Sequence, residues 1–345
     1  MIDQVVIIEW WIAQGTSLGV FLSDWFWSQL EGFVDLSQRS SVVYLLSAVS
    51  VALVWAMYRQ DKQAITSFYS LFSRPIWWSL SAQADYKLWL VNSLLMLAIA
   101  PLLLSQLTLA YWLFEQLHLL FSNRPDSTVW PSWLIVTSFT LCHFLLDDFA
   151  RFYLHRLLHK VPFLWAFHKV HHSARSLTPF TVFRTHPIEA LLFTLRSVLV
   201  QATSLAIFVF AFGSQADLYT VLGVSVFSFV FNLTGANLRH SHVPLGYWRI
   251  LESVLMSPAQ HQLHHSVEAR HFDKNFGVVL SIWDKIWGCH CYSEKHQQIQ
   301  FGLTKQTVEN EHKLTHLYGM PFVEAFQVLL RFKKFKRSSP LNKAK

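Results

Sequence analysis

Long apolar runs separated by short polar segments are the main pattern of this 345-residue chain. Five runs approach or exceed the length of a bilayer-spanning helix, at residues 41–58, 88–114, 130–150, 188–212 and 216–233. A helix of about 20 residues covers the roughly 30 Å of a hydrocarbon core. The pattern therefore predicts an all-α integral membrane protein with four to five transmembrane helices. The second run is long enough to bend, and the last is marginal in length.

Residues 1–30 are also apolar and rich in tryptophan, but Glu9 and Asp24 interrupt them. They lack the basic start and the short apolar core of a cleaved signal peptide. An amphipathic helix lying on the membrane surface fits this pattern better.

Charged residues are few and unevenly distributed. They make up 14% of the chain, against 52% for apolar residues, a balance unusual for a soluble domain. If all five runs cross, segments 59–87, 151–187 and 234–345 share one side and hold 4, 6 and 15 lysines and arginines. The opposite side holds only Arg39 and Arg124. The positive-inside tendency therefore assigns the first side to the cytoplasm.

Histidines form three motifs, and all of them lie on this predicted cytoplasmic side. The motifs are HRLLH (His155, His159), HKVHH (His168, His171, His172) and HQLHH (His261, His264, His265). Residues three and four apart share one face of a helix, so each motif projects its imidazoles together. Buried imidazoles without partners are costly, so three such motifs favour a metal site over a structural role.

The ligand type and number narrow the chemistry of this metal site. Imidazole suits iron, copper, zinc and nickel, but a structural zinc takes only four ligands. Eight histidines are enough for two ions. Such a site at the membrane surface suits oxidation of a lipid chain by dioxygen, because no side chain alone abstracts hydrogen from an unactivated C–H bond.

The motifs in their context resemble the fatty acid hydroxylase and sterol desaturase superfamily of membrane di-iron oxygenases. The resemblance covers about residues 130–290 and rests on DDFARFYLHRLLH, HKVHHSARSLTPFTVFRTHPIE, NLRHSH, SPAQHQLHH and DKNFGVVLSIWDKIWG. It implies two iron ions on the cytosolic face, dioxygen as co-substrate and the eight motif histidines as ligands. It also implies one or two ligands from the end of the last membrane segment, where His240 and His242 are the candidates.

Six further residues are candidates to support the ligands or to bind the substrate: Asp148, His186, Arg196, His271, Asp273 and Asn275. Asp148 lies two helical turns before the first motif and is placed to accept a ligand's ring N–H. Its alternative partners are Arg151 and Tyr153. Arg196 lies inside the fourth run, where it either binds a polar substrate group or snorkels to the interface.

His186 precedes Pro187 at the start of the fourth run, and it is either a ligand, a partner of a ligand or a helix-entry residue. Glu189 complements the positive end of that helix. His271 and Asp273 are placed to orient ligands, whereas Asn275 and Gly277 favour a turn.

The resulting organisation has four parts. An interfacial segment (1–40) and the first transmembrane helices (41–129) precede a catalytic domain (130–290) and a basic cytosolic tail (291–345). A cytosolic helical cap, formed after the third and the last spans, holds the metals. The basic tail favours attraction to anionic lipid and predicts no nucleic-acid partner.

The predicted activity is hydroxylation of a membrane lipid, with desaturation as the alternative. The chain contains no fused cytochrome-b5 motif, flavin site or iron–sulfur cysteine set, so electrons must come from an external donor. A cytochrome b5-like or ferredoxin-like carrier with its reductase suits the basic surface.

Three rival functions explain less of the pattern. A metal-ion transporter predicts ionisable residues inside several spans, which are nearly uncharged here. A metal-dependent hydrolase needs a carboxylate base among its ligands, as in HExxH. A bis-histidine haem protein needs only paired axial ligands and leaves most of these histidines unexplained.

Overall fold

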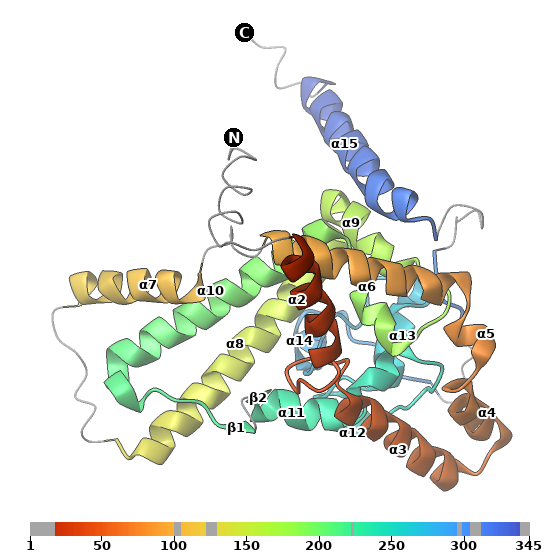
Figure 1. Ribbon diagram of the computed structural model, residues 1–345, viewed down its shortest axis with the longest axis horizontal. Coiled ribbons are helices and arrows are strands. Elements are labelled where there is room, and N and C mark those ends of the chain that lie inside the picture. The colour runs from red at the N-terminus through yellow and green to blue at the C-terminus, as the bar shows by residue number, and fades with distance from the viewer. Residues whose placement is uncertain are drawn as a thin grey trace.

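The computed structural model describes residues 18–99, 105–121, 130–221, 224–294, 299–303 and 312–338. Helices dominate this part of the chain (Figure 1). Nine buried or half-buried histidines come together within it. The strands within it are β1 (Thr220–Val221) and β2 (Val224–Ser225), which pair antiparallel. The prediction of a mostly helical protein is therefore confirmed.

Three of the described helices are long and apolar enough to cross a membrane: α3 (Val42–Arg59), α8 (Ser132–Lys160) and α10 (Pro187–Phe212). They correspond to three of the five predicted runs. Helices α8 and α10 lie side by side, and α7 (Gln106–Leu120) packs along α10 (Figure 1).

The other two runs are not single helices. Run 88–114 is divided between α6 (Leu80–Ile99) and α7, and residues 100–104 lie outside the described part of the chain. The prediction of a spanning helix over 216–233 is wrong. This run contains β1, β2 and the eight-residue α11 (Val226–Leu233), and α11 covers only about 12 Å. Thr220, Val221 and Val224 are β-branched, which lowers the helix propensity of the run.

The length of α8 is sufficient for one helix both to cross a membrane and to carry candidate metal ligands. Its 29 residues extend over about 44 Å, against about 30 Å for a hydrocarbon core. When its N-terminal turns lie at one membrane surface, roughly nine residues extend past the opposite one. His155 and His159 lie within those last turns.

The first and last described helices both contact α6. Helix α2 (Leu18–Glu31) contacts α6, where the Trp25 indole Nε1 donates to Ser93 Oγ over 2.8 Å. Residues 1–17 of the predicted interfacial segment lie outside the described residues. Helix α15 (Leu314–Ser338) packs on α9 (Pro162–His172) and α6. This C-terminal helix was missed by sequence reasoning, which treated the region only as a basic tail.

The other described helices are short, and some of them build the region around the histidines. They are α4 (Lys62–Ser70), α5 (Arg74–Trp77), η3 (Pro179–Phe183), η4 (Gly213–Gln215), η5 (Ala236–His240), α12 (Arg249–Glu252), α13 (Pro258–His264), η6 (Ala269–His271) and α14 (Ile282–Ile286). Helix α13 packs against η5, and α9 packs against α8 and α15. Segments far apart in the sequence therefore meet at the histidine motifs.

Candidate metal centre

Nine buried or half-buried histidines converge as two neighbouring groups, and within each group the ligand atoms lie within 4.8 Å of one another. The first group contains His155, His159, His168, His172 and His264. The second contains His171, His240, His261 and His265. The groups touch, because the rings of His172 and His265 stack with their centroids 4.5 Å apart. The structure thus brings together all eight motif histidines and adds His240.

Each HxxHH motif contributes to both groups. On α9, His168 and His172 are four residues apart and enter the first group, while His171 enters the second. In the α13 motif the assignment is the opposite: His261 and His265, four residues apart, belong to the second group, and His264 belongs to the first. Neighbouring helical residues point about 100° apart, so one turn of helix presents ligands to two adjacent points.

His240, at the end of the η5 turn, joins the second group, whereas His242 does not. The His242 ring packs against Phe301, with the ring centroids 5.6 Å apart. His186 is also outside both groups. It caps α10, where its Nδ1 accepts from Ile188 N–H over 3.2 Å and its Nε2 faces the Tyr318 carbonyl oxygen at 3.2 Å. This arrangement matches the helix-entry interpretation of His186.

The outer nitrogens of the first group are held by acceptors. The Nδ1 of His155 lies 2.8 Å from the Phe276 carbonyl oxygen, and that of His264 lies 2.8 Å from the Lys274 carbonyl oxygen. The Nδ1 of His168 lies 2.9 Å from Glu189 Oε1. Because a carbonyl or carboxylate oxygen only accepts, Nδ1 must carry the proton in each ring. The Nε2 lone pair then points into the group.

Those inward lone pairs have no protein partner. The Nε2 atoms of His159, His168, His172 and His264 are buried without a hydrogen bond. Burial lowers the pKa of His168, His172 and His264 well below the usual histidine value, and it lowers the pKa of His171 to about 3. The rings are therefore neutral near pH 7, which is the state that binds metal.

Three nitrogens of the second group form a triangle that hydrogen bonds alone do not explain. The Nε2 of His240 lies 3.0 Å from that of His261 and 3.3 Å from that of His265, and the latter two are 3.2 Å apart. Each ring nitrogen carries either a proton or a lone pair. Among three mutually close nitrogens, at least two therefore carry the same one, and these two cannot form a hydrogen bond with each other. Imidazoles at right angles around one ion, each bound at about 2.1 Å, lie about 3.0 Å apart. The residues present therefore fit a metal ion.

A loop at 274–280 presents the two carbonyls that hold His155 and His264, and two aspartates fix it. Asp284 accepts from the backbone N–H groups of Phe276 and Gly277 over 2.7 and 2.8 Å. Asp148, on α8, accepts from Val279 N, Leu280 N and Trp283 Nε1. Asp148 therefore supports the ligands through this loop, rather than by binding a ring N–H directly. Burial raises the pKa of Asp284 to about 6.

The remaining candidates have structural contacts. Asn275 adopts a φ of 58°, and its side chain bonds the backbone of Gln260 and Cys291, so it shapes the turn as predicted. Asp273 pairs with Lys160 at 2.6 Å on the surface. His271 is buried in η6, outside both groups. Arg196 pairs with Asp147 at 2.5 Å and belongs to neither histidine group.

A buried ion pair behind α9 was missed by sequence reasoning. Arg184 Nη1 lies 2.9 Å from Asp85 Oδ1, and both side chains are fully buried. Arg184 Nε also donates to the carbonyl oxygen of Val170, next to His171, over 2.9 Å. Asp85 belongs to α6, 99 residues from Arg184. No local signal in the sequence connects the two.

Glu189 was also missed as a partner of a ligand, because its position also suits the start of a helix. We expect Glu189→Gln to weaken metal retention and to lower turnover by about 10- to 100-fold, since it replaces the carboxyl group that orients the His168 ring. The measurement is iron retained during titration with a chelator, together with turnover.

The matched control is Glu324→Gln on α15, which removes the partner of Lys169, a half-buried residue of the same helix α9 as His168. This ion pair lies outside both histidine groups, so the variant should retain metal like the wild type. Equal metal loss in both variants would contradict the role assigned to Glu189.

Comparisons with known proteins agree with this site. Residues 140–289 match the family model described as fatty acid hydroxylase. The human alkylglycerol monooxygenase is 32% identical over 161 residues, which cover 47% of this chain and 32% of that protein. A Delta(7)-sterol 5(6)-desaturase of Gibberella zeae is 26% identical over 258 residues, which cover 74% of this chain and 70% of that protein. No solved structure matches the chain.

A third relative is the ornithine lipid hydroxylase of Rhizobium tropici, 26% identical over 178 residues, which cover 52% of this chain and 49% of that protein. The chain thus spans about a third of the human protein and about half of the bacterial one. A buried all-histidine cluster that could hold metal, beside helices long and apolar enough to cross a membrane, fits the class of membrane-associated metalloproteins. Within that class, residues 140–289 match the fatty acid hydroxylase family model, and the relatives are an alkylglycerol monooxygenase, a sterol desaturase and a lipid hydroxylase.

Proposed function

We propose that this protein is a di-iron enzyme that uses dioxygen to oxidise a C–H bond of a membrane lipid. The observation that carries the proposal is the convergence of nine neutral imidazoles, from α8, α9, η5 and α13, as two adjacent groups. The first group alone offers five nitrogen donors, one more than a structural zinc takes. Imidazole donors without thiolate or carboxylate suit iron among the metals that bind histidine.

Bound iron would supply the redox chemistry that side chains lack. Hydroxylation converts the C–H bond, dioxygen, two electrons and two protons into an alcohol and water. Desaturation uses the same oxidant and electrons to remove two hydrogens from adjacent carbons, giving an alkene and two waters. The names of the relatives include both outcomes. We favour hydroxylation, and the electrons come from an external carrier.

The chain's own residues prepare the site for this reaction. Glu189 and the carbonyl oxygens of Phe276 and Lys274 fix the tautomers of three ligands. The ligand side chains of both groups are largely shielded from solvent, which limits side reactions with water. Asp148 and Asp284 hold the 274–280 loop in position.

The proposed placement is multi-pass, with the centre on the cytoplasmic face. The support is the excess of lysine and arginine in 59–87, 151–187 and 234–345, together with the length of α8. The catalytic domain extends over 130–290, between the first membrane helices and the basic C-terminal region.

Metal analysis coupled to turnover tests this proposal. Full-length protein without a histidine tag, purified in detergent from iron-supplemented cells, is expected to hold about two irons per chain. With a chemical reductant, dioxygen and a total lipid extract, we expect lipid products that carry one added oxygen atom. Zinc alone, with no dioxygen-dependent change in any lipid, would overturn the proposal.

A further inference from the structure

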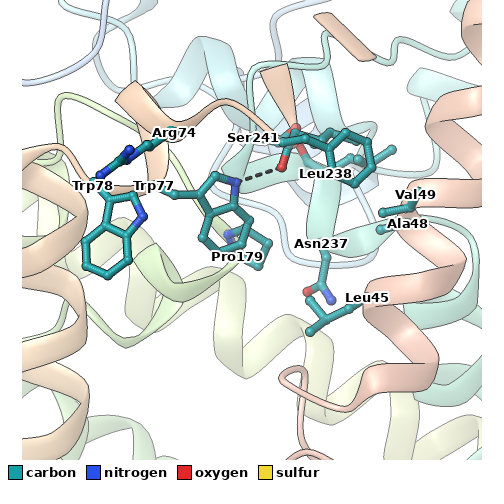
Figure 2. A pocket seen from close by; sticks show the side chains of 12 residues that line it. Leu45, Ala48, Val49, Arg74, Trp77, Trp78, Pro179, Asn237, Leu238 and Ser241 are labelled. Atoms are coloured by element: carbon teal, nitrogen blue, oxygen red, sulfur yellow. Dashed lines mark hydrogen bonds between the residues drawn. The ribbon is translucent and has the colours of Figure 1, made fainter. Parts of the chain in front are cut away.

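A cavity of about 610 Å³ lies between the first membrane helix and the turn that carries His240. Leu45, Ala48 and Val49 of α3 form one side, and the α4–α5 segment forms the opposite side (Figure 2). Pro179 of η3 lines its middle. The volume is in the range of sites that bury a ligand of drug size.

The interior of this cavity is apolar because its polar groups already have partners. Trp77 Nε1 donates to the Leu71 carbonyl oxygen over 2.7 Å, and Ser241 Oγ donates to the Leu238 carbonyl oxygen over 2.7 Å. Asn237 Nδ2 donates to the Arg39 carbonyl oxygen over 2.9 Å. A cavity that offers water few partners is better filled by hydrocarbon.

A single cation lies among the residues that line the cavity. Figure 2 shows Arg74 next to Trp78 at one end, and the α3 residues at the other. Arg74 is exposed, and within the described part of the chain no hydrogen bond or ion pair engages its guanidinium. A guanidinium in this position matches a phosphate or carboxylate. The cavity therefore combines an apolar interior with an anion-binding end.

The same cavity borders the metal centre through η5. Leu238 and Ser241 line it and lie on either side of His240 in the sequence. A ligand chain within the cavity would therefore lie against the turn that presents a metal ligand.

We propose that this cavity binds the apolar chain of a lipid whose anionic head group pairs with Arg74. The assignment names the substrate class of the proposed oxidation and rests on that proposed function. It identifies Arg74 and the α3 residues as determinants of substrate choice. The head group is defined by its charge, and a phosphate or a carboxylate supplies it.

Binding is measured first, because it needs neither dioxygen nor turnover. The probes are palmitoyl lysophosphatidic acid, palmitate and the uncharged monopalmitoylglycerol, added to the full-length protein in detergent and counted by native mass spectrometry. Wild-type protein should bind at least one acidic probe more tightly than the neutral one. Comparing the two acidic probes distinguishes a phosphate head group from a carboxylate.

Leu45→Phe fills the cavity and should weaken binding of every probe by at least tenfold. Its matched control is Leu46→Phe, one residue along α3, because Leu46 is 62% exposed and does not line the cavity. Val49→Phe repeats the test if Leu45→Phe does not fold. Wild-type affinity in a folded cavity-filling variant would overturn the assignment.

Arg74→Gln should weaken binding of the acidic probes by about tenfold, the loss of one charge-assisted contact, and leave the neutral probe unchanged. Lys62→Gln, which removes another exposed cation outside the cavity, is the control. An equal effect on all probes, or no effect, contradicts the role of Arg74. Turnover then distinguishes the two proposals. Normal lipid binding without oxidation would refute the proposed oxygenase function. Unchanged lipid oxidation by the cavity variants would refute the proposal that the cavity binds the substrate.

Discussion

His240→Ala is expected to lower turnover by more than 100-fold and to reduce the iron content from about two ions per chain to about one. The His240 Nε2 lies 3.0 Å from that of His261 and 3.3 Å from that of His265. Removing it leaves three donors in the second group. Loss of a ligand should cost more than the 10- to 100-fold typical of the residues that support ligands. The measurements are metal content and lipid oxidation on the same preparation.

His242→Ala is the matched control, two residues away. His242 is half-buried against Phe301 and belongs to neither group, so its loss should leave the iron content unchanged. The comparison decides between two candidates that the sequence could not separate. If His242→Ala loses iron and His240→Ala keeps it, the ligand assignment is reversed.

The motif histidines could be predicted because their spacing is local. Residues four apart share a helix face, so HRLLH and the two HxxHH motifs required only that their segments be helical. The division of each HxxHH motif between two groups needed the third dimension. This division depends on how α9 and α13 are placed against α8, and a short sequence motif contains no information about that placement.

The residues that support the ligands could not be predicted in the same way. Glu189 lies 21 residues from His168, and its position also suits an acidic residue in the first turn of a helix. The choice of His240 over His242 depends on η5, which ends at His240. The His240 ring lies in the second group, whereas the His242 ring, two residues later, packs against Phe301. Asp148 was identified as a supporting residue, but the 274–280 loop through which it acts could not be foreseen.

The prediction of candidate membrane helices from the sequence has a similar limit. Uniform hydropathy predicted α3, α8 and α10, because length and composition are sufficient for such helices. The run at 216–233 is equally apolar but rich in β-branched residues, and it forms β1, β2 and the short α11 instead. Residues 216–233 still connect α10 to η5 and α13. The two HxxHH motifs therefore meet although the predicted fifth helix is not formed.

Asp85→Asn is expected to destabilise the protein by about 3–5 kcal/mol, because it leaves the buried Arg184 guanidinium without its countercharge. Both side chains of the pair are fully buried. The effect should extend to the metal centre, since Arg184 Nε also donates to the Val170 carbonyl oxygen beside His171. We therefore expect a lower thermal midpoint in detergent, together with reduced iron content.

Two further variants separate a buried charge effect from a general loss of packing. Asp85→Asn combined with Arg184→Gln removes both charges and should recover part of the stability, giving a favourable coupling energy in a double-mutant cycle. Asp273→Asn breaks the exposed pair with Lys160, whose side chains are each 42% exposed, and should cost at most about 1 kcal/mol. Asparagine also tolerates the positive φ of 59° at Asp273. If Asp85→Asn is as mild as Asp273→Asn, the buried pair does not hold α9 in place, and the positions of His171 and His172 depend on the packing of α9 against α8 and α15.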